Sequence, residues 1–383
     1  MPCDMLTSHA GLTVLGAAGV LLLALSLAAG EAAAPAGDAW PKIARFFKPP
    51  PEMAGDLGTY RSPLLFDDGR PVKAAADWPK RREEILKTWH ALMGPWPPLV
   101  EKPRVEIVET KPRDGLTQKK VRVEVAAGRL IDGILLVPPG KGPFPAVLVV
   151  FYDAETSAGL NSKYAGLDFG YQLSRRGFVS LSLGNDVWGA PRQGEGIQVL
   201  SYLAYEAANA HTALAAMPEV DPARIGIVGH SFGGKWALFA SCLYDKFACA
   251  AWSDPGIVFD ETRPNVNYWE PWYLGREPGV ERAAGLVTEK NPRTGPYRRM
   301  IETGRDLHEL HALMAPRPLL VSGGSEDPPE RWKALNHAVA VNKLLGREDR
   351  VAMTNRKEHN PDAEADEQIY LFFEHFMGPG KGR

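Results

Sequence analysis

A serine between two glycines is the residue of this chain best suited to nucleophilic chemistry. Ser231 stands in the run Gly229-His230-Ser231-Phe232-Gly233, between the buried strand-like stretch 224–229 and a helix-like stretch from Gly233 onward. In such a strand, turn and helix context, G-x-S-x-G holds a serine on a strained turn, and the glycines leave room for the neighbouring strand and helix. The pattern predicts that Ser231 is a nucleophile that forms an acyl-enzyme.

A serine hydroxyl is a weak nucleophile unless a general base, itself oriented by a carboxylate, takes its proton. His359 follows the last strand-like stretch, 350–354, and precedes the closing helix, which is where this base is expected. Asp327 follows the preceding strand, 318–322, and is the predicted acid. Other carboxylates that could serve are Glu326, one position away, and Asp254 and Asp260 after the strand before.

Backbone amides should stabilise the negative oxygen of the tetrahedral intermediate. One predicted donor is the amide of Phe232, and the other is the amide of Tyr152 or of Asp153, directly after the strand 146–151. His230 adjoins the nucleophile, but from this turn it should point into the fold, so we interpret it as structural. The mechanism requires neither a metal nor a cofactor.

The run His308-Glu309-Leu310-His311 superficially resembles a metal site. Its histidines are three residues apart, whereas H-E-x-x-H places them four apart on one helix face. We therefore predict no metal site there, and expect an exposed helix turn.

Short apolar stretches alternate with helical ones through the second half of the chain. The alternation predicts an α/β fold with a mostly parallel sheet, an antiparallel start and helices on both faces. The expected strands are 105–110, 119–126, 129–137, 146–151, 178–183, 224–229, 248–253, 318–322 and 350–354, and the expected helices 79–92, 166–176, 199–216, 233–243, 329–345 and 361–376.

Three parts of the chain differ in composition. Residues 1–36 are apolar and small, which predicts a signal peptide and a secreted or periplasmic protein, with a retained N-terminal membrane anchor as the alternative. Residues 37–104, rich in proline and glycine, should form an extension packed on the core, and 105–383 the catalytic domain. Within it, about 256–305 is long and aromatic. We expect a cap-like insertion after the sixth strand, the alternative being a loop whose aromatic residues form a local core.

The charge balance excludes some partners. Lysine and arginine number 44 against 46 acidic residues, a formal charge of −2, and no basic stripe indicates nucleic-acid binding. No obligate protein partner is indicated. Cys242 and Cys249 lie in apolar runs, so we expect buried thiols more than a disulfide.

From about Arg129 to Met377 the chain resembles α/β-hydrolases of the dienelactone hydrolase and acetyl xylan esterase type. Gly229-His230-Ser231-Phe232-Gly233-Gly234-Lys235, followed by Ala315-Pro316-Arg317-Pro318, is similar to glucuronoyl esterases, in which the elbow reads G-C-S-R-x-G-K. The resemblance implies that Lys235 hydrogen-bonds sugar hydroxyls. It also shows a departure, because Phe232 stands where those enzymes have an arginine that helps to hold the oxyanion.

The expected function is therefore that of a secreted serine carboxylesterase acting on carbohydrate-linked esters of the acetyl xylan or glucuronoyl type. Trp269 and Trp272 in the insertion could stack on sugar faces, although aromatic residues also pack as ordinary core. Two alternatives remain. One is a peptidase related to prolyl oligopeptidases, and the other is a catalytically silent binding protein with the same fold.

Overall fold

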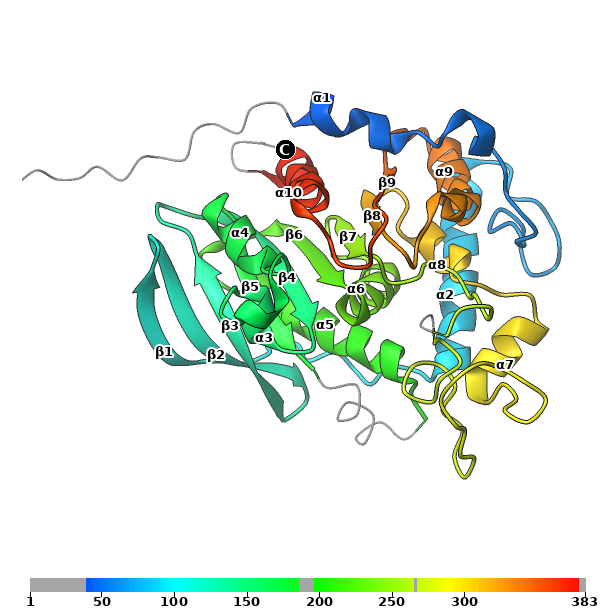
Figure 1. Cartoon of the computed structure of the whole chain (residues 1–383), viewed down its shortest axis with the longest axis horizontal. Coiled ribbons are helices and arrows are strands. Elements are labelled where there is room, and N and C mark those ends of the chain that lie inside the picture. The colour runs from blue at the N-terminus through cyan, green and yellow to red at the C-terminus, as the bar shows by residue number, and fades with distance from the viewer. Residues whose placement is uncertain (1–38, 186–195, 265–266, 379–383) are drawn as a thin grey trace, which may run out of the picture. The chain divides into compact units, whose positions relative to one another are not determined.

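Nine strands form one mixed sheet in the described residues of the computed structural model (Figure 1). The structure describes residues 39–185, 196–264 and 267–378, so the segment expected to be a signal peptide or anchor, 1–36, lies outside it. The strands are β1 (Val105–Arg113), β2 (Leu116–Ala126), β3 (Arg129–Val137), β4 (Phe144–Phe151), β5 (Val179–Gly184), β6 (Val220–His230), β7 (Ala250–Ser253), β8 (Leu319–Gly323) and β9 (Val351–Asn355).

The order of the strands in the sheet is β1-β2-β3-β5-β4-β6-β7-β8-β9. The pairs β1/β2, β2/β3 and β3/β5 are antiparallel, and every later pair is parallel. This confirms the predicted α/β architecture with an antiparallel start. Because parallel strands end at the same edge, the turns after β4, β6, β7, β8 and β9 meet there.

Helices cover both faces of the sheet. They are α1 (Trp40–Ile43), α2 (Trp78–Met93), α3 (Ala154–Ser157), α4 (Phe169–Arg175), α5 (Val199–Ala215), α6 (Phe232–Leu243), α7 (Gly295–Glu302), α8 (His308–Leu313), α9 (Trp332–Leu344) and α10 (Ala363–Met377). Short 3₁₀ helices span Ala44–Phe47, Pro51–Met53, Ala75–Asp77, Ser162–Tyr164 and Pro329–Arg331. Among the described residues, no helix is both long and apolar enough to cross a membrane.

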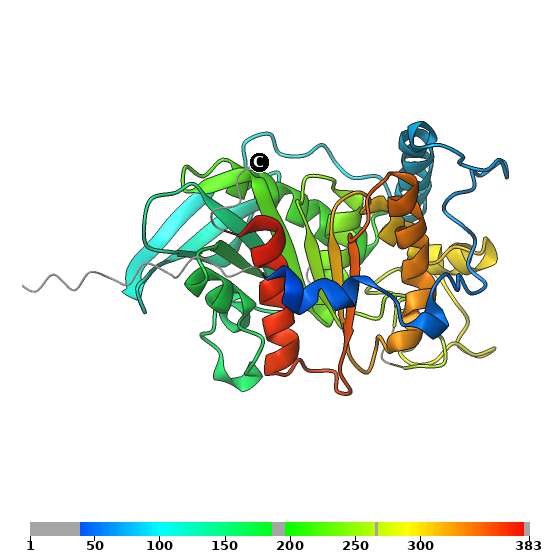
Figure 2. The same cartoon turned by 90° about the horizontal axis from the view of Figure 1, so that it is seen from above.

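The central strand β4 shows how a separate hydrophobic core forms on each face of the sheet. Its alternate residues Ala146, Leu148 and Val150 join the larger core, with α2, α5, α6, α8 and α9. Val147 and Val149 point to the other face and join a second core, with α1, α4 and α10. In Figure 1 α1 and α10 lie above the sheet and α5 below it, and Figure 2 shows α1 lying against α10. Burial of both faces explains the unbroken apolar runs of the parallel strands.

Besides α1, the described part of the N-terminal extension is attached to the sheet domain through α2. Trp78, Ile85, Trp89 and Met93 lie on one face of this helix and are buried in the larger core. Trp89 Nε1 also donates to Glu309 Oε2 at 2.9 Å. The extension therefore shares the core of the sheet domain.

The helix α8 corrects one prediction, because its turn is buried instead of exposed. His308, Glu309 and His311 are fully buried. Glu309 is surrounded by partners, since it accepts from Trp89 and from Arg305 Nη1 at 2.9 Å. A buried carboxylate is tolerated only when paired in this way, and the sequence pattern did not reveal the pairing.

The insertion 256–305 follows β7, which is the expected strand 248–253 and the seventh strand in chain order, not the sixth. It contains α7, and its aromatic residues pack inward. Tyr268, Trp269 and Tyr297 are fully buried and belong to the larger core. The aromatic run thus serves mainly as core, which was the alternative interpretation.

Candidate active site

A sharp turn joins β6 directly to α6 and carries Ser231. Its φ of 54° and ψ of −113° are values that residues with a Cβ rarely adopt, so the turn is strained as predicted. A Cβ on Gly229 would lie 2.2 Å from the carbonyl oxygen of Gly233, and one on Gly233 would lie 2.0 Å from that of Val150. Only glycine fits at these two positions, where β4, β6 and α6 meet beneath the serine.

Three side chains from the ends of β6, β7 and β9 form a hydrogen-bonded chain. His359 Nε2 lies 2.9 Å from Ser231 Oγ, and His359 Nδ1 lies 2.7 Å from Asp254 Oδ2. An ionised carboxylate only accepts hydrogen bonds, so Nδ1 carries the proton and donates to Asp254. Nε2 is then the acceptor for the hydroxyl of Ser231, which is the geometry of a nucleophile with its general base and orienting acid.

The carboxylate beside His359 is therefore Asp254, and the expectation that Asp327 would stand there is wrong. Asp327 Oδ2 accepts from the amide of Gly256 at 2.8 Å, and Asp327 Oδ1 accepts from that of Ile257 at 2.6 Å. It is fully buried behind the turn that follows Asp254. Glu326 and Asp260 form ion pairs with Arg263 and Arg331, respectively.

Hydrogen bonds to the carboxylates of Asp254 and Asp327 connect the loops after β7 and β8. While Asp327 binds amides of the loop after β7, Asp254 Oδ1 accepts from the amide of Gly324 at 2.6 Å and from that of Asp327 at 2.9 Å. Asp254 has a φ of 48°, which turns its side chain toward the β8 loop. The orienting carboxylate is thus fixed by backbone donors as well as by His359.

The two carboxyl groups differ in their ionisation. Burial acts to raise the pKa of Asp254, but the hydrogen bond from His359, the charge of Arg356 and the backbone amides outweigh it and hold this pKa below its usual value. Burial and the negative charge of Asp254 together raise the pKa of Asp327. Asp254 is therefore the ionised partner that an imidazolium at His359 requires.

The predicted oxyanion donors come from the start of α6 and from the end of β4. Phe232 is the first residue of α6, so its amide has no partner within the helix. Tyr152 and Asp153 follow β4, and the ring of Tyr152 stacks on that of Phe232 with centroids 4.6 Å apart. In the described part of the chain, the amides of these three residues have no backbone acceptor. Either residue after β4 remains available as the second donor.

Sequence comparisons relate the chain to esterases. Residues 107–252 match the family described as "Esterase FrsA-like". The chain is 25% identical over 363 residues to 4-O-methyl-glucuronoyl methylesterase 1 of Wolfiporia cocos (strain MD-104), covering 82% of this chain and 80% of that protein.

Comparison with solved structures establishes the fold. A glucuronoyl esterase from Solibacter usitatus superposes with a TM-score of 0.66 at 20% identity, over 84% of this chain and 98% of that one. The protein has the α/β-hydrolase fold. A CE15 glucuronoyl esterase from Teredinibacter turnerae T7901 gives a TM-score of 0.60 at 19% identity, over 84% of this chain and 90% of that one.

Two of the side chains expected to bind sugar lie inside the protein. Lys235 is 4% exposed, and its Nζ donates to the carbonyl of Pro255 at 2.6 Å. Burial lowers the pKa of Lys235 to about 8. Trp269 is fully buried and donates to the carbonyl of Gly285 at 2.8 Å, so it cannot stack on a substrate. Trp272 is partly buried against the core.

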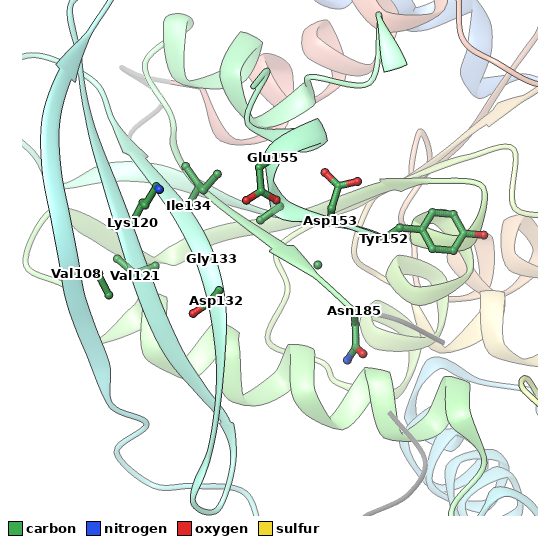
Figure 3. Close-up of a pocket in the computed structure, with 12 residues that line it drawn as sticks. Val108, Lys120, Val121, Asp132, Gly133, Ile134, Tyr152, Asp153, Glu155 and Asn185 are labelled. Atoms are coloured by element: carbon green, nitrogen blue, oxygen red, sulfur yellow. The ribbon is translucent and has the colours of Figure 1, made fainter. Parts of the chain in front are cut away.

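A polar pocket lies beside the site. It has a volume of about 420 Å³ and reaches from Tyr152 at one end to Val108 on β1 at the other (Figure 3). Its lining mixes charged, amide and apolar groups, and Figure 3 labels Val108, Lys120, Val121, Asp132, Gly133, Ile134, Tyr152, Asp153, Glu155 and Asn185 in it. Tyr152 lines one end of the pocket and stacks on Phe232, so this ring lies between the pocket and the turn that holds the nucleophile.

The other residues singled out from the sequence occupy structural positions. His230 is buried with Nδ1 3.0 Å from Ser253 Oγ, and burial, together with the charges of His359 and Arg356, lowers its pKa to about 3. Cys242 and Cys249 are buried free thiols, as predicted. The sequence signal for Asp254 is its position on the loop after a parallel strand, β7, and Asp327 on the loop after β8 shares this signal.

Proposed function

We propose that this protein is a serine carboxylic ester hydrolase of the glucuronoyl esterase type, which cleaves esters of glucuronate units carried by a polysaccharide. The observation that carries the proposal is the hydrogen-bonded chain from Ser231 through His359 to Asp254. The substrate class is supported by the 4-O-methyl-glucuronoyl methylesterase of Wolfiporia cocos, which aligns over most of both chains.

In the proposed reaction, His359 takes the proton of Ser231 as its hydroxyl attacks the ester carbonyl. Asp254 stabilises the imidazolium that forms, and His359 then protonates the departing alcohol. A water molecule, activated by the same histidine, attacks the acyl-enzyme and releases the free acid and the serine. His359 is 37% exposed, so water has access to it for this second step.

In this proposal, backbone amides stabilise the oxyanion. The resemblance implies an arginine after the nucleophile, but the Phe232 ring is 1% exposed and packs beneath Tyr152. The amide of Phe232 at the N-terminus of α6 and one amide after β4 would therefore stabilise the negative oxygen without a side-chain cation.

The test is to measure hydrolysis of methyl glucuronate, of p-nitrophenyl acetate and of a proline-containing peptide nitroanilide by the parent and by Ser231→Ala. We expect serine-dependent cleavage of methyl glucuronate. Cleavage of p-nitrophenyl acetate alone would indicate that the substrate is an acyl ester and not a glucuronate ester. Cleavage of the peptide nitroanilide alone would indicate a peptidase. If the parent has no turnover and a fluorophosphonate leaves Ser231 unlabelled, the protein is a binding protein and the proposal fails.

The pocket beside Tyr152 suits the part of a polysaccharide that extends beyond the ester. Lys120 and Glu155 lie on its walls, and an ammonium and a carboxylate are strong partners for sugar hydroxyls. We expect the double variant Lys120→Ala/Glu155→Ala to raise KM for a methyl-esterified glucuronoxylan by about 3- to 10-fold, the loss of roughly one hydrogen bond.

The same variant should keep the parent's constants on methyl glucuronate, which carries no further sugar units for Lys120 and Glu155 to bind. Glu101→Ala/Lys102→Ala is the matched control, since it removes one carboxylate and one ammonium that are exposed and do not line the pocket. An equal effect of both double variants on KM would refute a role of the pocket.

A further inference from the structure

Arg356 lies between the end of the sheet and the loop that carries His359. It is the first residue after β9, and its amide donates to the carbonyl of Gly323 at 3.0 Å. Its guanidinium points inward, where Nη1 donates to the carbonyl of Ser322 at 2.9 Å and to Ser322 Oγ at 3.0 Å. Nη2 also reaches Ser253 Oγ at 3.4 Å. The group is thus anchored at the ends of β7 and β8.

The same guanidinium also binds the loop of the histidine. Nη2 donates to the carbonyl of His359 at 2.5 Å, and Nε donates to that of Asn360 at 2.9 Å. One rigid, planar group therefore connects the main chain on both sides of the imidazole to two strand ends. Arginine suits this role because its donors are fixed in a plane, whereas a lysine has a single nitrogen.

The loop has few other attachments. From Lys357 to Pro361, its backbone makes no hydrogen bond to another backbone group within the described ranges. Lys357, Glu358 and Asn360 are exposed. A side-chain hydrogen bond between Asn360 and His230 also restrains the loop. Among the described residues, the guanidinium is the group that binds the carbonyls on both sides of the imidazole.

We propose that Arg356 is a positioning residue, which fixes His359 in line between Ser231 and Asp254 by holding the His359 and Asn360 carbonyls against the ends of β7 and β8. The proposal rests on the proposed function, because it concerns the base of that reaction. In this role Arg356 acts on proton transfer and not on substrate binding. Removal of its guanidinium should therefore lower kcat and leave KM nearly unchanged.

The test compares Arg356→Ala and Arg356→Lys with the parent and with Lys357→Met, on an ester that the parent hydrolyses. Lys357 is the matched control, because its side chain is 94% exposed and pairs with the exposed Glu358. We expect Arg356→Ala to lower kcat by about 10- to 100-fold, since a displacement of about 1 Å in a reacting group has this effect. Added methylguanidinium should restore part of the lost kcat and leave the parent and Lys357→Met unchanged.

The outcomes separate the two proposals. If the parent lacks serine-dependent turnover, the proposed function fails. If the parent is active, a kcat of Arg356→Ala close to that of Lys357→Met overturns the positioning role, as does a loss that methylguanidinium does not relieve. Should Arg356→Ala not fold, Arg356→Lys decides, because the proposal requires a reduced kcat at an unchanged KM and a general structural role does not.

Discussion

Replacing Ser231 with alanine will lower kcat for ester hydrolysis by about 10⁵- to 10⁶-fold, because the attacking oxygen disappears and only binding and oxyanion donors remain. The residual rate should be independent of whether His359 is also replaced, since the two act as one unit. The measurement is the initial rate on methyl glucuronate at saturating substrate, for Ser231→Ala, His359→Gln and the double variant.

Ser162→Ala is the matched control for the loss of a serine hydroxyl. Ser162→Ala removes a hydroxyl from an exposed residue that takes no part in the hydrogen-bonded chain, and it should retain the parent rate. Ser231→Ala should also lose labelling by a fluorophosphonate while its thermal unfolding stays close to that of the parent. Retention of more than about a hundredth of the parent kcat would contradict the nucleophilic role, given the size of such losses.

Replacing Asp254 with asparagine will lower kcat by about 10³- to 10⁴-fold, because an amide in this place favours the wrong tautomer of His359 and cannot stabilise its positive charge. Asp327→Asn is the comparison that separates the two carboxylates. It keeps one acceptor for the amides of Gly256 and Ile257. We expect a far smaller loss of kcat, and a loss of about 1–3 kcal/mol in the free energy of unfolding.

Steady-state kinetics and urea unfolding of both variants decide the assignment. The expected pattern is a kinetic defect in Asp254→Asn and chiefly a stability defect in Asp327→Asn. The reverse pattern would return the role of the acid to Asp327 and show that His359 turns toward the β8 loop in solution.

Most of the fold could be predicted from the sequence, because each buried parallel strand is a short apolar run followed by turn residues. The predicted strand 146–151 is Phe144–Phe151 in the structure, and the predicted helix 199–216 is Val199–Ala215. Ser231 and His359 were found for a related reason. Each follows a strand that ends at the same edge, in the chain order that this fold imposes.

The acid could not be chosen in this way, because Asp254 and Asp327 both follow such strands. The choice depends on the positive φ of Asp254 and on which loop amides each carboxylate accepts, and neither leaves a pattern in the sequence. Burial of Trp269 and of Glu309 was missed for a similar reason. An aromatic residue or a carboxylate looks the same in a sequence whether partners from distant segments surround it or not.

The reciprocal binding of the β7 and β8 loops has a consequence for how this active site can change over evolutionary time. A carboxylate is present after each strand, and each already accepts amides from the opposite loop. A lineage could transfer the orienting role from one strand to the other by reorienting the histidine, without passing through a protein that lacks a carboxylate there. Because each loop presents a carboxylate that binds the other loop, either loop could supply the orienting acid. The nucleophile and the general base would stay in place.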